Sequence, residues 1–221
     1  MIRKVLLALA VIAPWFVRKA ILRFCCGAVF GKDSYVGHSF IDTRKLDLGE
    51  GARIGNLNSL RHVKEVKLGS MAILGNLNWI SGLSHMTGVD EMGNYRSGRL
   101  ILGEGAAITN RHYLDMHSDI EVGRMSLVAG VRSTLLTHSI DFATNRQAKS
   151  GIIVGAYSFL GTNCVVLPGT VVADHCIIAA GAVVKGHLEK PGCLYGGVPA
   201  KFLKEIPDGL PFFNRKEAFV E

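Results

Sequence analysis

The sequence has almost no helical periodicity between its two ends, although 48% of its 221 residues are hydrophobic. Apolar residues that recur every three or four positions are the main sign of amphipathic helices. Their absence over the middle of the chain excludes a helical bundle and favours an all-β protein. A chain of this length and hydrophobic content suits one domain with a continuous core.

Motifs for nucleic-acid binding and for paired cysteines are also missing. The chain has 25 basic and 18 acidic residues, but no basic cluster is interleaved with aromatic residues, so we expect no nucleic-acid partner. The basic balance suits anionic partners, such as a phosphorylated cofactor or an acidic membrane surface. The five cysteines are odd in number and form no CxxC pair. We therefore expect reduced thiols in a cytoplasmic protein.

The stretch from Val154 to Lys185 repeats every six residues. The fifth residue of each block and the first of the next lie two apart, so they face the same way in an extended chain. A six-residue period predicts a β-helix solenoid, with three blocks in each triangular coil. The first positions are aliphatic and the fifth are small or hydroxylic, in the order Val154, Ser158, Leu160, Cys164, Val166, Thr170, Val172, Cys176, Ile178, Ala182 and Val184.

The same register runs back to Leu48 with two interruptions. We expect loops that leave a corner of the solenoid at 82–99 and 139–151, because solenoids accept insertions there and such loops often carry function. The repeated GNLN at 55–58 and 75–78 predicts stacked asparagine ladders. The chain then divides into an N-terminal apolar helix (1–31), the β-helix (32–187) and a C-terminal cap and tail (188–221), which covers the unpaired edges of the last coil.

The N-terminal segment combines an apolar run with flanking cations. Its uncharged part, from Val5 to Val17, is too short to span a bilayer, and Pro14 interrupts it. No small-x-small cleavage site supports a signal peptide. We expect a helix that lies in the membrane interface, with Trp15 and Phe16 near the headgroups. This would place the protein in the cytoplasm, peripheral on the inner face of the cytoplasmic membrane. A helix packed on the solenoid or on a neighbouring subunit is the alternative.

Most candidate catalytic groups lie between Ile108 and Asp141. His112 takes a fifth position and Asp115 a second position where glycine is common, and such departures from a strong pattern gather at functional sites. His138 lies where a coil breaks into the second insertion, so it is accessible and is our candidate general base. A three-histidine zinc site that includes His112 and His117 lacks a well-placed third ligand. We therefore expect no metal, and a structural or surface role for His117.

Four stretches resemble the hexapeptide-repeat acyltransferases, and among them the sugar and polysaccharide O-acetyltransferases. They are THSID at 137–141, FLGTNCVVLPGTVV at 159–172, IIAAGAVVK at 177–185 and YGGVPAK at 195–201. The resemblance covers about residues 48–204. It implies a left-handed parallel β-helix, an exception to the usual right-handed crossover. It also implies a homotrimer with active sites between subunits and acetyl-CoA as co-substrate, with no bound cofactor.

The resemblance also assigns roles to single residues. His138 matches the catalytic histidine, which takes the proton of an acceptor hydroxyl as that oxygen attacks the thioester. Asn110 and Asp115 match acceptor-binding positions, and we add His112 and Asp141 from the same stretch as candidates. The positions that would meet coenzyme A are Thr162, Ala180, Lys185, Gly186, Lys201 and Lys204.

The predicted function is transfer of an acetyl group from acetyl-CoA to a hydroxyl of a sugar, in cell-surface polysaccharide biosynthesis. N-acylation of an amino sugar is the main variant. The apolar N-terminus suggests an acceptor presented at a membrane, such as a lipid-linked sugar. Two alternatives stay open: a zinc hydratase of the γ-carbonic-anhydrase type on the same fold, and a non-catalytic scaffold tethered to a membrane.

Overall fold

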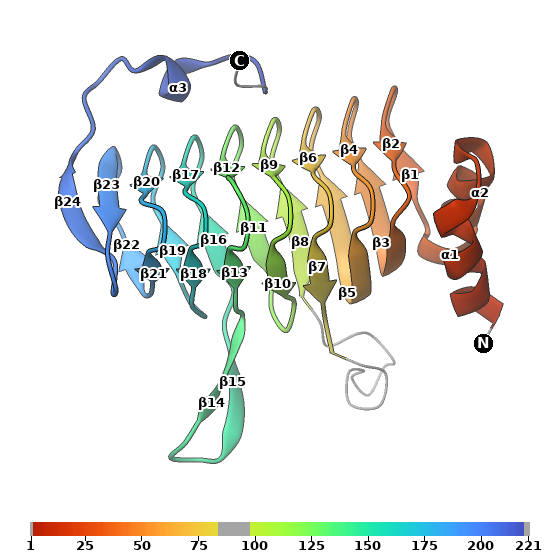
Figure 1. Cartoon of the computed structure of the whole chain (residues 1–221), viewed down its shortest axis with the longest axis horizontal. Helices are drawn as coiled ribbons and strands as arrows, with labels where there is room; N and C mark the ends of the chain where they lie inside the picture. The colour runs from red at the N-terminus through yellow and green to blue at the C-terminus, as the bar shows by residue number, and fades with distance from the viewer. Residues whose placement is uncertain (1, 84–97, 219–221) are drawn as a thin grey trace.

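The computed structural model describes residues 2–83 and 98–218. It is a stack of triangular coils, with two helices at the N-terminal end and a hairpin that projects from one corner (Figure 1). Strands pair in parallel with the equivalent strands one coil before and one coil after. The predicted all-β fold, a left-handed parallel β-helix with an apolar helical N-terminus and a C-terminal cap, is confirmed.

The strands form three faces of the prism. The first face holds β1 (Val29–Phe30), β3 (Phe40–Leu48), β5 (Ser59–Leu68), β8 (Arg99–Leu102), β11 (Ile120–Val122), β16 (Ile152–Val154), β19 (Val171–Val172) and β22 (His187–Leu188). The second holds β2 (Tyr35–Val36), β4 (Arg53–Ile54), β6 (Ile73–Leu74), β9 (Ala107–Ile108), β12 (Leu127–Val128), β17 (Phe159–Leu160), β20 (Ile177–Ile178) and β23 (Cys193–Gly196). The third holds β7 (Trp79–Ser81), β10 (Tyr113–Asp115), β13 (Thr134–Leu135), β18 (Val165–Val166) and β21 (Val183–Val184), and the long strands β3 and β5 begin on this face.

The strand register confirms the three-block coil. Val154 pairs with Val172, Leu160 with Ile178 and Val166 with Val184. On the first face, Leu68 pairs with Leu102 and Val122 with Val154, although the residues of each pair lie further apart in the sequence than one coil. They enclose the two predicted insertions. The second contains the hairpin of β14 (His138–Asp141) and β15 (Arg146–Lys149), whereas most of the insertion at 82–99 lies outside the described residues.

The first and fifth positions of the repeat fill the interior, as predicted, and all of those named above are buried. At one corner the fifth positions also form a ladder. Each side chain accepts a hydrogen bond from the backbone N–H of its counterpart in the next coil, and the ladder runs through Ser39, Asn58, Asn78, His112 and Ser133 and ends at the N–H of Cys164. An outer ladder of Asn56, Asn76 and Asn110 runs in the opposite direction, because the side chains of Asn76 and Asn110 accept from the backbone N–H of the counterpart in the preceding coil. The expected asparagine ladders are therefore confirmed.

The N-terminus folds as two helices where the sequence predicted one. α1 (Ile2–Ile12) and α2 (Trp15–Cys26) meet at Pro14, which cannot continue a helix because it lacks a backbone N–H. Leu7 and Leu22 pack into the core at the first coil. Among the described helices, none has the length and apolar character needed to cross a membrane.

The C-terminal residues close the other end of the stack. β24 (Lys201–Glu205) pairs antiparallel with β23 and covers the edge of the second face. The chain then runs back along the coils through α3 (Pro211–Asn214), as Figure 1 shows. Arg215 donates a hydrogen bond to the carbonyl of Met125 and lies over the ring of Phe212. The cap therefore follows the solenoid instead of extending from it.

Candidate active site

A carboxylate lies at the corner where the third face ends. Asp115 ends β10, and its side chain is 1% exposed. Its Oδ2 accepts hydrogen bonds from the backbone N–H groups of Thr137 (3.0 Å) and His138 (3.2 Å). The Thr137 hydroxyl donates to the Asp115 carbonyl at 2.6 Å. These bonds exist because β13 pairs with β10, which places the chain after β13 directly over the end of β10.

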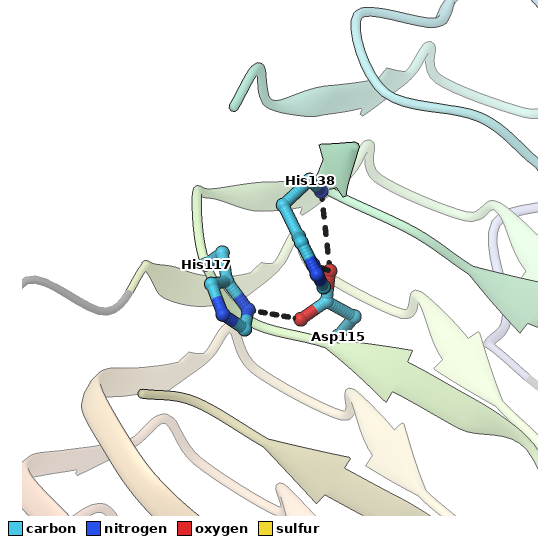
Figure 2. A group of neighbouring side chains, drawn as sticks. All are labelled: Asp115, His117 and His138. Atoms are coloured by element: carbon cyan, nitrogen blue, oxygen red, sulfur yellow. Dashed lines mark hydrogen bonds and ion pairs between the residues drawn. The ribbon is translucent and has the colours of Figure 1, made fainter. Parts of the chain in front are cut away.

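Two histidines share this carboxylate. His138 Nδ1 lies 2.5 Å from Asp115 Oδ2, and His117 Nδ1 bonds to Asp115 Oδ1. The two imidazole rings stack with centroids 3.8 Å apart and planes 25° apart, and Figure 2 shows them on one side of the carboxylate. The side chain of His138 is 32% exposed and that of His117 is 15% exposed. The cluster therefore has a buried anion and two accessible rings.

These hydrogen bonds decide the protonation of the cluster. Burial alone would raise the pKa of Asp115, but the hydrogen bonds from His138, His117 and Thr137 outweigh it and hold that pKa below its ordinary value. Because Asp115 is ionised, the Nδ1 atom of each neutral histidine carries the proton and donates it to the carboxylate. Nε2 of His138 is then the basic nitrogen, and within the described residues it has no hydrogen-bond partner. This arrangement suits a general base.

The structure corrects the expected role of His112. This residue is 2% exposed and belongs to the inner ladder, where its Nδ1 accepts the backbone N–H of Ser133 at 3.1 Å. Its Nε2 lies 3.0 Å from the hydroxyl of Thr109. Burial lowers the pKa of His112 to about 4. Both ring nitrogens are occupied, so this histidine is a structural counterpart of the asparagines in earlier coils and not an acceptor contact.

Three other predicted acceptor contacts lie elsewhere or have other partners. Asn110 ends the outer ladder, where its Oδ1 accepts a hydrogen bond from the backbone N–H of Asn76 at 2.7 Å. It precedes β10, whereas Asp115 ends that strand, so the two lie at opposite corners of the third face. Asp141 is exposed and caps the hairpin turn by accepting from the backbone N–H of Ala143 and the hydroxyl of Thr144. Asp115 itself is enclosed and orients His138, so it is not open to an acceptor.

The residues predicted to meet coenzyme A divide into three places. Thr162 and Ala180 precede β18 and β21, at the same corner as Asn110. Lys185 and Gly186 follow β21, at the corner of His138. Lys201 and Lys204 are exposed on β24. One chain therefore presents these residues at two different corners and at the C-terminal end, with the width of the third face between the two corners.

His117 is the site residue that sequence reasoning missed. It follows β10 by two residues, in the turn that leads into β11, and its place beside His138 depends on the pairing of β10 with β13. The run Asp115-Met116-His117 was a usable signal. Residues two apart in an extended chain point to the same side, so a histidine two positions after the aspartate can approach its carboxylate.

Comparison with known proteins finds similarity to hexapeptide-repeat proteins over part of the chain. A model described as "Bacterial transferase hexapeptide (six repeats)" matches residues 151–186. A gamma carbonic anhydrase 1 of Arabidopsis thaliana mitochondria is 30% identical over 93 residues, which are 42% of this chain and 34% of that protein. The putative lipopolysaccharide biosynthesis O-acetyl transferase WbbJ of Escherichia coli is 36% identical over 56 residues, 25% of this chain and 28% of that one. The chain thus spans about a third of each of these relatives.

Solved structures share the fold over most of the chain. The polysialic acid O-acetyltransferase OatWY superposes with a TM-score of 0.56 at 15% identity, covering 83% of this chain and 87% of that one. AntD, an N-acyltransferase from Bacillus cereus in complex with dTDP and 3-hydroxybutyryl-CoA, gives a TM-score of 0.52 at 14% identity, covering 87% and 90%. The chain therefore carries the hexapeptide repeat over residues 151–186 and shares its β-helix fold with these acyltransferase structures.

Proposed function

We propose that the protein is a CoA-dependent acyltransferase that moves an acetyl group from acetyl-CoA to a hydroxyl of a sugar. The observation that carries this proposal is the hydrogen bond of 2.5 Å between Asp115 and Nδ1 of the accessible His138. It fixes one tautomer and leaves Nε2 to act as a base. The acetyl donor and the sugar acceptor are supported by the relatives, which include a putative lipopolysaccharide O-acetyl transferase.

In the proposed reaction, Nε2 of His138 takes the proton of the acceptor hydroxyl as the oxygen attacks the thioester carbonyl. The tetrahedral intermediate then expels the CoA thiolate, which receives that proton from Nε2, so the enzyme returns to its initial state. Asp115 stays ionised and stabilises the imidazolium between the two steps. No covalent enzyme intermediate is needed, because positioning and one base supply much of the rate.

We propose that the complete site forms between copies of the chain, in a homotrimer. Two observations support this. The residues expected to meet coenzyme A are distributed over two corners that a single chain holds apart. The β14–β15 hairpin also projects from the corner of His138 (Figure 1) and exposes Ile140 and Phe142 at 55% and 91%. Exposed apolar side chains on a projecting arm are typical of an interface.

A metal-dependent hydratase is the competing function, because two gamma carbonic anhydrases are among the relatives and three side chains that can bind a metal converge. Asp115, His117 and His138 offer ligand atoms within 4.8 Å of one another. These residues do not fit a cation well as they stand. The Nδ1 atoms of both histidines face the carboxylate as hydrogen-bond donors, and both Asp115 oxygens already accept from them.

Acetyl-CoA binding by calorimetry, followed by transfer assays with sugars, tests the proposal. We expect the wild type to bind acetyl-CoA, and Lys185→Glu/Lys201→Glu to weaken that binding. The matched double variant Lys64→Glu/Lys67→Glu, which reverses two exposed lysines on β5, should bind like the wild type. His138→Ala should bind acetyl-CoA but lose transfer by about 10²–10⁴-fold.

Other outcomes point to the other functions. Stoichiometric zinc in the purified protein, with no acetyl-CoA binding, would favour the hydratase. Transfer activity that survives in His138→Ala would remove the proposed base. Full biological function of that variant would favour a scaffold.

A further inference from the structure

The two N-terminal helices are apolar on both sides. Leu7 and Leu22 pack into the core, as expected for helices that cover the end of a solenoid. The opposite side of a surface helix is normally polar. Here it exposes apolar side chains at 36–80%, which are Ile2, Val5, Leu9 and Ile12 of α1 and Phe16, Val17 and Phe24 of α2. We name these seven residues the outer apolar face. An apolar surface of this kind marks a binding site.

Two arginines hold the helices so that this face points outward. Arg18 is 1% exposed and donates to the carbonyls of Ala10 (2.9 Å), Ala13 (2.6 Å) and Val36 (2.6 Å). It thereby joins the end of α1 to α2 and to the first coil. Arg3 donates to the carbonyls of Cys25 (2.9 Å) and Thr43 (2.7 Å) and pairs with Asp42. The outer apolar face is therefore a preformed surface, fixed at the N-terminal end of the stack (Figure 1).

The charge of the protein is concentrated in the same segment. No acidic residue precedes Asp33, whereas six of the 25 lysines and arginines do. The remaining chain has 19 basic and 18 acidic residues, so nearly all of the net charge of +7 lies at the N-terminus. Lys4 and Arg23 are exposed on the helices, and Lys19 lies 5.8 Å from the ring of Trp15. The outer apolar face is thus bordered by Lys4, Lys19 and Arg23, in a segment (1–32) that contains no acidic residue.

We infer that the outer apolar face docks into the surface of an anionic lipid bilayer. The apolar side chains would enter the boundary between headgroups and acyl chains, while Lys4 and Arg23 meet the lipid phosphates. A second copy of the same face is a poor occupant, because two copies would bring like charges together without an acidic partner. This inference is independent of the proposed chemistry, since it rests on the helices and not on the corner of His138.

Sedimentation of the full chain with lipid vesicles tests the inference. One set of vesicles is phosphatidylcholine alone and the other is phosphatidylcholine mixed with phosphatidylglycerol. We expect binding to the anionic vesicles, and a fall of at least about tenfold in the partition coefficient for Phe16→Ser/Phe24→Ser. The matched variant Phe202→Ser/Leu203→Ser removes two exposed apolar side chains from β24, at the other end of the stack, and should bind vesicles like the wild type.

A second variant separates charge from apolar burial. Lys4→Glu/Arg23→Glu keeps the outer apolar face, and we expect it to lose most of its preference for anionic over neutral vesicles, by about fivefold for each cation removed. Circular dichroism and thermal unfolding show that each variant is folded. Absence of wild-type binding to anionic vesicles would overturn the inference. So would equal loss of binding in the β24 control. If vesicles are not bound and Phe16→Ser/Phe24→Ser instead lowers the oligomeric state, the face contacts a second copy of the chain.

Discussion

At the scale of single residues, the two oxygens of Asp115 act on two different histidines. Replacing Asp115 by asparagine would place an amide N–H₂ opposite Nδ1 of His138 in one orientation of the amide and opposite Nδ1 of His117 in the other. The backbone N–H groups of Thr137 and His138 require an oxygen at the Oδ2 position, so the N–H₂ faces His117. His138 then keeps its tautomer but loses the negative charge that stabilises its imidazolium. We expect Asp115→Asn to lower kcat by about 10²–10⁴-fold, with the dissociation constant of acetyl-CoA unchanged.

Steady-state kinetics and calorimetry on the same preparation check this expectation. The control is Asp119→Asn, because Asp119 lies in the same turn as His117 but pairs with Arg99 at 2.7 Å instead of with a histidine. Its kcat should remain within a few-fold of the wild type. Near-wild-type turnover by Asp115→Asn would show that the negative charge beside His138 does not control the reaction.

The sequence predicted the identity of this aspartate better than its role. The position of His138 beside an insertion was readable from the broken register. The burial of Asp115 could not be read from the register. Asp115 takes the second position of its block, which lies at a corner, and the exposure of a corner depends on the coil stacked above it. His117 was assigned to structure or surface for the same reason. Its contact with the His138 ring, 3.8 Å between centroids, arises only when β13 stacks on β10.

At the scale of the element, the inner ladder explains why a histidine occupies a core position. His112 accepts a hydrogen bond from a backbone N–H of the next coil, as Asn58 and Asn78 do in earlier coils. Burial lowers its pKa to about 4 from 6.5. The unfolded chain therefore takes up a proton between these values and the folded chain does not. Stability from the neutral ring is complete above pH 6.5 and falls as the pH drops toward 4, by up to about 3 kcal/mol.

Urea unfolding of the wild type and of His112→Asn between pH 7 and pH 4.5 tests this dependence. Asparagine keeps a ladder acceptor but does not titrate. We expect the variant to be less stable at neutral pH, because it fills less of the core, and to lose less free energy of unfolding on acidification. Parallel losses in the two proteins would mean that other groups cause the acid sensitivity.

The elements themselves were largely predictable. Six-residue spacing fixes which side chains point inward, and the lengths of the two interruptions in the register were readable from the positions of Leu68, Leu102, Val122 and Val154. The break of the N-terminal helix at Pro14 was visible as a proline in an apolar run, yet the sequence did not show that Arg18 would be buried there. A buried arginine depends on carbonyls from α1 and β2 that only the folded chain brings together.

At the scale of the whole molecule, one chain holds the proposed base apart from two of the residues expected to meet coenzyme A. His138 follows the third face at one corner, whereas Thr162 and Ala180 precede it at the other. The family resemblance predicted these residues but not how far apart one subunit holds them. The two sets would meet only if the corner of one copy faces the hairpin of the next, as closed cyclic assemblies with head-to-tail contacts allow.

Mixed assemblies give a direct test of a site shared between copies. His138→Ala removes the base, and Ala180→Trp places a large side chain at the exposed corner expected to hold the pantetheine arm. Each variant alone should be inactive. When the two are coexpressed in equal amounts, half of the subunits carry an intact base and the other half carry an intact coenzyme A corner. Random pairing of neighbouring subunits then brings the two intact parts together in about a quarter of the sites, which gives about a quarter of the wild-type activity. A site within one chain would give none, because no subunit carries both intact parts.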